Sequence, residues 1–179
     1  MCGIAGYFNP DQNYAENPKQ NFHTLSRMIN TMNHRGPDTY GHTIINSCCL
    51  AHTRLSIIDL ENGRQPMSYT KDGNTYYIVY NGEIYNYKEV KKTLLRKNYT
   101  FETNSDTEVI IAAFCHYGPG FVKELNGIFA IAIYDSMRNT LYLYRDRFGV
   151  KPLYYTKTGD TLVFASRIDT LFEYPRVRP

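Results

Sequence analysis

The second residue carries the most reactive side chain near the start of this chain, because Cys2 follows Met1 and precedes Gly3. If Met1 is removed, which the small Cys2 side chain favours, one residue presents both a thiol and a free α-amine. The amine titrates near ~8 and the thiol near ~8.5, so around neutral pH the amine can accept the thiol proton without a histidine. Cys2 is therefore a candidate nucleophile with its own base. The alternative is a small buried cysteine at the start of a strand, the usual role of a lone cysteine.

The residues after Cys2 predict the element that has to hold it. Residues 2–8 are short and apolar, contain two glycines and end at Asn9-Pro10-Asp11, which indicates a buried strand closed by a turn. Apolar residues then recur at helical spacing from Phe22 to Met32, and this helix is predicted to end before His34-Arg35-Gly36-Pro37. The later pattern predicts strands at 41–46, 48–53, 76–80, 128–135, 140–145, 153–156 and 161–165, and helices at 87–97 and 106–117. This order indicates packed sheets covered by helices.

Composition excludes several classes of function. The 179 residues fit one domain, and 42% apolar with 21% charged residues is ordinary for a globular protein. The net charge of +3 is interspersed, so no basic stripe indicates nucleic-acid binding, and no apolar run approaches the ~18 residues of a membrane helix. The four cysteines form neither a CxxC pair nor a disulfide framework, and no secretion signal is recognisable. We therefore expect a cytoplasmic protein.

Five segments in a fixed order carry a family resemblance: Cys2–Gly6, His34–Asp38, His52–Asp59, Tyr80–Tyr87 and Asp146–Tyr155. Together they resemble the glutamine-hydrolysing domain of class II amidotransferases, in particular that of asparagine synthetases, over nearly the whole chain. The resemblance implies an N-terminal nucleophile hydrolase fold, an α+β four-layer αββα sandwich of two antiparallel sheets. It also implies that Cys2 becomes the first residue and attacks the side-chain amide carbon of glutamine.

The resemblance assigns two further catalytic residues by position. Asn81 and Gly82 match the family's oxyanion residues, for which a side-chain amide and a backbone N–H at a strand end are suitable donors. Taken alone, an Asn-Gly pair is more typical of a hairpin turn, and only its place among the ordered segments favours the oxyanion role. The histidines show no recurring metal-ligand spacing with cysteines and are interpreted as structural or surface residues, so no metal is expected.

Substrate binding is also assigned through the resemblance. Arg54 matches the residue that binds the α-carboxylate of glutamine, a task suited to a guanidinium with two parallel donors. Asp106 matches the residue for the α-ammonium, with Glu83 assisting, although its place at a predicted helix start also suits an ordinary N-cap. The backbone of three neighbouring residues is expected to help line the pocket: Leu55, Ile57 and Ile58.

The expected organisation is a glutaminase domain over residues 1–172, with 173–179 starting a connector to a missing synthetase domain. No cofactor is expected in this domain, because no pyrophosphatase loop, Walker-type loop or acidic metal cluster precedes Pro179; ATP and magnesium belong to the synthetase domain. L-glutamine and a C-terminal or separate ATP-dependent synthetase domain are the expected partners, and a homodimer is also allowed. Arg167 departs from the acidic residue usual in asparagine synthetases, which affects contacts with that domain.

Two alternatives to this function stay open. The domain could supply ammonia to another acceptor, as in the sugar-phosphate, phosphoribosyl or β-lactam relatives. It could also be a catalytically silent interaction domain that retains Met1.

Overall fold

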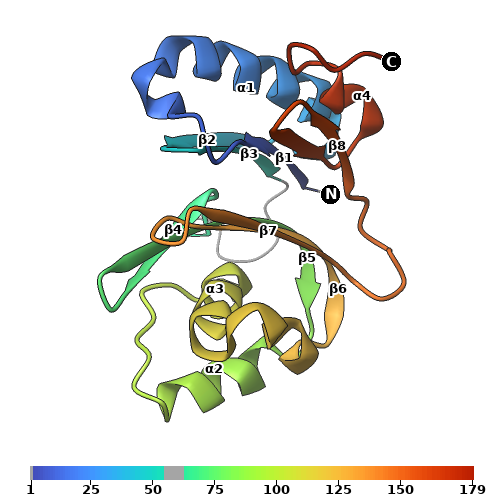
Figure 1. Ribbon diagram of the computed structural model, residues 1–179. Helices are drawn as coiled ribbons and strands as arrows, with labels where there is room; N and C mark the ends of the chain where they lie inside the picture. Colours follow the sequence, from blue (N-terminus) through green and yellow to red (C-terminus); the bar gives the residue numbers. More distant parts are fainter. Residues whose placement is uncertain (1, 55–62) are drawn as a thin grey trace.

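The computed structural model describes residues 2–54 and 63–179, which form two antiparallel sheets stacked between helices (Figure 1). Within these residues the first sheet has the strand order β2-β3-β1-β9-β8 and the second the order β4-β5-β6-β7. The first sheet consists of β2 (Thr39–Ile45), β3 (Cys48–Arg54), β1 (Gly3–Phe8), β9 (Thr161–Ala165) and β8 (Tyr154–Thr158). The second consists of β4 (Met67–Lys71), β5 (Asn74–Ile84), β6 (Gly127–Asp135) and β7 (Thr140–Arg145).

Helices cover the outer face of each sheet (Figure 1). The long α1 (Pro18–Met32) and the short α4 (Ile168–Leu171) lie over the first sheet, while α2 (Tyr87–Leu95) and α3 (Asp106–Tyr117) lie under the second. In the described part of the chain, three 3₁₀ segments also occur in the connections: η1 (Tyr14–Glu16), η2 (Asn33–Arg35) and η3 (Gly118–Glu124). The predicted α+β sandwich of four layers is confirmed.

The apolar run in β6 is buried on both faces, as its sequence predicts. Ile131 and Ile133 belong to the core between the second sheet and its helices, whereas Ala130 and Ala132 belong to the core between the two sheets. Successive side chains of a strand point to opposite faces, so the alternation of Ile with Ala places the small side chains where the sheets face one another.

The core between the sheets determines which residues of each strand face the partner sheet. Ile4 of β1, Leu50 of β3, Phe164 of β9 and Val79 of β5 are all buried in it. A separate core lies between the first sheet and α1, and it contains Tyr7, Leu25 and Met28, among others. Every second residue of β1, β3 and β5 is thereby directed into the space between the sheets.

Two strands differ from the sequence-based expectation. β4 was not predicted, and β5 continues four residues beyond the predicted limit at Tyr80. Asn81 and Gly82 consequently lie inside β5, paired with Ala130 and Phe129 of β6, so they form neither a hairpin turn nor a strand end. The expectation failed because polar residues and a glycine imitate a turn, whereas pairing with β6 keeps this segment extended. The short α4 was also not predicted.

The last residues contact the body of the domain. Tyr174 and Val177 pack against the core beneath α1, and Arg27 donates from Nε to Glu173 Oε2 at 2.8 Å. The domain limit at residue 172 stays a prediction.

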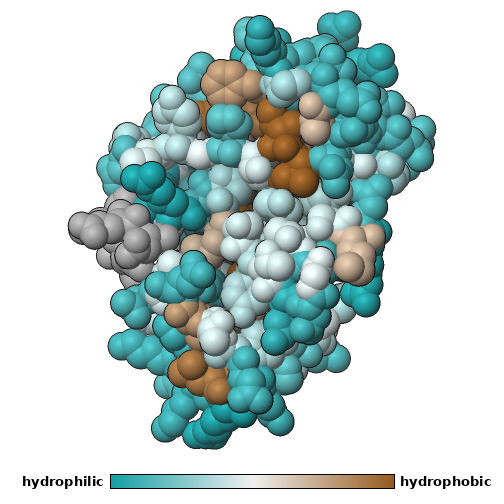
Figure 2. Space-filling model, turned by 90° about the vertical axis from the view of Figure 1, so that its left-hand side faces the viewer, coloured by the Kyte–Doolittle hydropathy of each residue, from teal (hydrophilic) through white to brown (hydrophobic). Residues whose placement is uncertain are grey.

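The face in Figure 2 is mainly hydrophilic, with apolar side chains in separate small groups. Across the described ranges, we find no helix with the length and apolar character needed to traverse a bilayer.

Candidate active site

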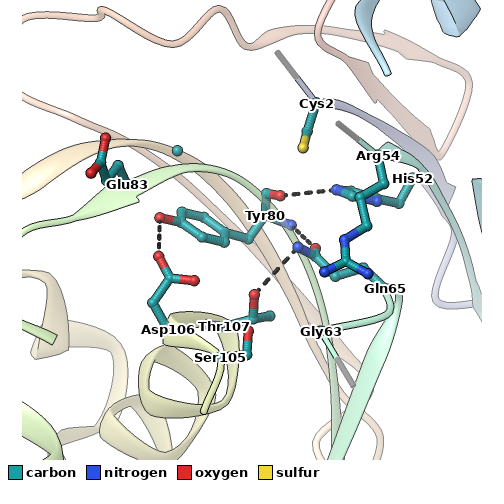
Figure 3. Close-up of a pocket in the computed structure, with 11 residues that line it drawn as sticks. Cys2, His52, Arg54, Gly63, Gln65, Tyr80, Glu83, Ser105, Asp106 and Thr107 are labelled. Carbon is teal, nitrogen blue, oxygen red and sulfur yellow. Dashed lines mark hydrogen bonds between the residues drawn. The ribbon is translucent and has the colours of Figure 1, made fainter. Parts of the chain in front are cut away.

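Alternation along β1 and β3 directs three polar side chains toward the second sheet. Cys2 lies two residues before Ile4, which is buried between the sheets, and His52 and Arg54 continue the face of β3 that includes Leu50. Side chains two residues apart in a strand share a face. Figure 3 shows the Cys2 sulfur and the side chains of His52 and Arg54 reaching into the same region.

The facing wall comes from β5, which lies against β1 and β3. Val79 is buried between the sheets, so Asn81, two residues later, is directed toward the first sheet as well. Asn81 is only 2% exposed, and its buried Nδ2 has no hydrogen-bond partner in the part of the chain that the structure describes. A buried donor without an acceptor costs about 1–3 kcal/mol. This amide therefore remains available to an acceptor that enters from outside.

A cavity of about 90 Å³ lies beside β5, just past the point where its pairing with Met67, the first residue of β4, stops. Pairing between β4 and β5 reaches only Met67 opposite Ile78, and the later residues of β5 border the cavity. Backbone groups of alternate residues point to the same edge of a strand. The N–H of Gly82 therefore faces the same edge as the N–H of Tyr80. The Tyr80 N–H has no strand acceptor there within the described residues and donates to Gln65 Oε1 at 2.6 Å.

The cavity brings together five of the residues expected at the site: Cys2, Arg54, Gly82, Glu83 and Asp106. Six further residues also line it: His52, Gly63, Gln65, Tyr80, Ser105 and Thr107. Asn81 is not part of the lining surface and lies directly between two residues that are. The volume is enough for several water molecules. Leu55, Ile57 and Ile58 lie outside the described residues.

Asp106 is the first residue of α3, but it does not cap the helix. The cap is Ser105, whose side chain accepts a hydrogen bond from the Thr107 N–H at 3.1 Å. Asp106 Oδ2 instead accepts from the Tyr80 hydroxyl at 2.8 Å. Burial raises the pKa of the Asp106 carboxyl, and the hydrogen bonds from Tyr80 and from nearby backbone N–H groups oppose this rise. The N-cap interpretation of Asp106 is therefore wrong.

Arg54 ends β3 and is 6% exposed. The segment His34–Asp38 lies against its backbone, since the Asp38 N–H donates to Arg54 O at 3.1 Å. Gly36 permits this approach, because a Cβ at that position would lie 2.6 Å from the Arg54 backbone nitrogen. Arg35 of the same segment donates from Nε to Cys2 O at 3.2 Å. The segment thus braces both Cys2 and Arg54.

Arg167 ties this bracing segment to the last helix. Its Nη1 lies 2.7 Å from His34 Nε2, and its Nε donates to Asp169 Oδ1 at 2.7 Å. The arginine that replaces the expected acidic residue therefore has an ion-pair partner within its own domain.

His52 was interpreted as structural or surface, and the structure places it in the cavity wall at 1% exposure. The signal that could have found it is alternation, because His52 stands between Leu50 and Arg54 on one face of β3. Glu83 lies at the opposite end of the group from Arg54 in Figure 3.

The profile of a glutamine amidotransferase domain family matches residues 1–179. The chain belongs to this family. It is 40% identical over 178 residues to asparagine synthetase [glutamine-hydrolyzing] 3 of Bacillus subtilis, covering 99% of this chain and 28% of that protein. It is 45% identical over 175 residues to asparagine synthetase [glutamine-hydrolyzing] 2 of the same organism, covering 98% of this chain and 23% of that protein.

The fold of this amidotransferase domain also matches a solved structure, the glutamine phosphoribosylpyrophosphate amidotransferase of B. subtilis. The TM-score is 0.73 at 20% identity, covering 96% of this chain and 43% of that one. The domain thus has the architecture of an N-terminal nucleophile hydrolase and is homologous to the glutaminase domains of asparagine synthetases. It spans about a quarter of the length of the two synthetases it matches.

Proposed function

We propose that this domain hydrolyses L-glutamine to glutamate and ammonia through a thioester on Cys2. The observation that carries the proposal is the shared cavity of Cys2, Arg54, Gly82 and Asp106. The buried Asn81 amide, between Tyr80 and Gly82, has no hydrogen-bond partner among the described residues. These groups come from both sheets and from the start of α3. They supply a nucleophile, oxyanion donors, a cation and an anion, the set that a zwitterionic amide substrate needs.

Arg54 and Asp106 would hold the α-carboxylate and α-ammonium of glutamine, leaving the side-chain amide to reach Cys2. A guanidinium binds a carboxylate with two parallel hydrogen bonds, which also fixes its orientation. Asp106 at the first position of α3 must be ionised to bind an ammonium. The hydrogen bond from Tyr80 favours that ionised form and thus opposes the effect of burial.

The chemistry then follows from the positions of the donors. The α-amine of a processed Cys2 takes the thiol proton, and the thiolate attacks the amide carbon. The negative charge that develops on the amide oxygen is stabilised by Asn81 Nδ2 and the Gly82 N–H. The tetrahedral species expels ammonia, which receives the proton held by the α-amine, and water hydrolyses the remaining thioester to glutamate. No step uses a cofactor in this domain.

Two further inferences concern the acceptor of the ammonia and the compartment in which the reaction takes place. The homologues are named glutamine-hydrolysing asparagine synthetases, so the acceptor would lie on an ATP-dependent synthetase domain, in the same chain or in a separate one. The cytoplasm is the compartment we propose for this activity.

The test is glutamate release from glutamine by the processed protein. Cys2→Ala should abolish release, and it should also abolish covalent labelling by a diazoketone analogue of glutamine that alkylates the nucleophile. Cys115→Ala is the matched control, because Cys115 is half-buried beside the core under the second sheet, away from the cavity. Equal release and labelling by Cys2→Ala and the unchanged protein would contradict the proposal, as would a mass showing retained Met1 in fully active protein.

A further inference from the structure

The backbone of Tyr80 is held by side chains instead of a neighbouring strand. Beyond Ile78, β4 no longer pairs with this edge of β5. The Tyr80 N–H donates to Gln65 Oε1 at 2.6 Å, and Tyr80 O lies 3.2 Å from His52 Nε2. Buried backbone groups have to be paired, so Gln65 and His52 replace the missing strand at this one residue.

These two side chains join Tyr80 to other parts of the site. His52 reaches across from β3 in the first sheet, as Figure 3 shows. Gln65 donates from Nε2 to Thr107 Oγ1 at 3.3 Å, and Thr107 follows Asp106 in α3. The Tyr80 hydroxyl donates to Asp106 itself. One residue of β5 is thus connected to the first sheet and to the helix that carries Asp106.

His52 can act only as a hydrogen-bond donor to Tyr80. Tyr80 O is an acceptor, so His52 Nε2 has to carry the hydrogen. Burial, together with the nearby charge of Arg54, lowers the pKa of His52 to about 3, and the bond to Tyr80 O opposes this only in part. The ring is therefore neutral around pH 7, with a fixed tautomer.

We propose that His52 is a positioning residue that sets the oxyanion donors through the carbonyl of Tyr80, with Gln65 as its counterpart on the N–H. Tyr80 is bonded directly to Asn81, and a rotation about this segment moves both the Asn81 amide and the Gly82 N–H. Catalytic groups tolerate displacements of only about 0.5 Å, and 1 Å can cost ~10²-fold in rate. The proposal rests on the proposed glutaminase reaction.

The decisive comparison is between His52→Leu and His52→Gln. Leucine fills a similar volume without a donor, whereas the glutamine amide can place its Nε2 near that of histidine. We expect His52→Leu to lower kcat about 10- to 100-fold with KM within about twofold, because Arg54 and Asp106 still bind the substrate. His52→Gln should restore kcat to within about fivefold. His42→Leu, at an exposed position in β2, is the control and should change neither constant.

A second readout separates positioning from a general loss of structure. The γ-aldehyde analogue of glutamine adds the Cys2 thiol reversibly and gives a tetrahedral oxygen that needs the oxyanion donors, whereas the product glutamate does not. In His52→Leu the affinity for the aldehyde should fall in parallel with kcat, and the affinity for glutamate should stay unchanged. If His52→Leu does not fold, Gln65→Met removes the other side-chain contact, the one with the Tyr80 N–H, and should give the same pattern.

Several outcomes would overturn the inference while leaving the glutaminase intact. Full kcat in both His52→Leu and Gln65→Met would show that the Tyr80 contacts do not set the donors. An inactive His52→Gln, with the loss of one ionisation from the pH profile of kcat/KM, would make His52 a base. Equal loss of glutamate and aldehyde binding would show a purely structural role. Failure of the parent protein to release glutamate would instead contradict the proposed function.

Discussion

Asn81 illustrates how a residue can be unfavourable for folding and still be favourable for the proposed reaction. Its amide nitrogen is buried without a partner among the described residues, and its neighbours in β5 are otherwise well packed. A strand position facing another sheet is normally apolar, as Val79 is two residues earlier. The free donor is explained if an oxygen of the reacting substrate occupies this position during turnover.

This view predicts opposite effects of one substitution on stability and rate. Asn81→Leu keeps the side-chain size and removes the unpaired donor. We therefore expect the free energy of unfolding to stay the same or to rise by up to ~1 kcal/mol. The loss of an oxyanion donor should lower kcat by about 10²–10³. Urea unfolding and glutamate release measure the two effects. A variant that is both less stable and fully active would contradict the assignment.

Asp106 predicts how glutamine binding depends on pH. Burial raises the pKa of Asp106 above ~3.9, the ordinary value for aspartate. Only the ionised carboxylate attracts an ammonium, so the KM for glutamine should rise as the pH falls and Asp106 becomes protonated. Asp106→Asn should raise KM at neutral pH and remove this dependence. The measurement is KM for glutamine between pH 5 and 8. A pH-dependence that persists unchanged in Asp106→Asn would assign the titration to another group.

At the scale of the element, the loop after β7 is organised by one carboxylate. Asp146 Oδ1 accepts from the N–H groups of Phe148 and Val150 at 3.0 and 3.2 Å, and Oδ2 accepts from those of Phe129 and Lys151 at 3.1 and 3.3 Å. These backbone donors lower the pKa of Asp146 although its burial opposes the shift. Phe129 pairs with Gly82, so the loop is anchored one strand away from the cavity.

Removing this carboxylate should destabilise the domain. We expect Asp146→Ala to lower the free energy of unfolding by about 1–3 kcal/mol at pH 7, because backbone donors lose their acceptor. A lowered pKa contributes stability above the ordinary value of ~3.9, which is lost as the pH falls through the folded value. The difference between the two proteins should therefore shrink below about pH 4. Urea unfolding at pH 7 and below about pH 4 measures the difference in free energy of unfolding between Asp146→Ala and the unchanged protein. Asp160→Ala, in an exposed turn, is the control.

At the scale of the whole molecule, the site exists only while the two sheets remain packed together. Cys2 directly precedes β1 and Arg54 ends β3, both strands of the first sheet, whereas Asn81 and Gly82 lie in β5 of the second. Phe164 is fully buried in the core between them. Packing in this core therefore determines both the stability of the domain and the alignment of the nucleophile with the oxyanion donors.

Phe164→Ala should accordingly cost about 3–5 kcal/mol in the free energy of unfolding, through lost burial and the cavity that remains. Tyrosine fluorescence and far-ultraviolet circular dichroism should report one shared transition, because one core joins both sheets. Phe148→Ala is the matched control: Phe148 is 91% exposed, so its change should stay within ~0.5 kcal/mol. Two separate transitions in Phe164→Ala would show that the sheets unfold independently.

Period-two and helical patterns in the sequence predicted most elements and packed sheets covered by helices, because these patterns reflect which faces are buried. The family, and through it the four-layer architecture, came from the resemblance carried by five ordered segments. The ordered segments placed Cys2 and Arg54 in one site, and Asp106 was assigned to it through the family resemblance. The sequence could not show that Asn81 and Gly82 continue a strand, because an Asn-Gly pair has the same local preferences in a turn and only pairing with β6 decides between them.

The role of His52 likewise depends on tertiary structure. Nothing local distinguishes a histidine that fills a core from one that donates to a carbonyl of the opposite sheet. That contact arises because β4 stops short of Tyr80, and the stacking of two sheets brings β3 to the unpaired edge. Sequence patterns specify which face a side chain takes, whereas the packing of separate sheets decides which backbone group it meets.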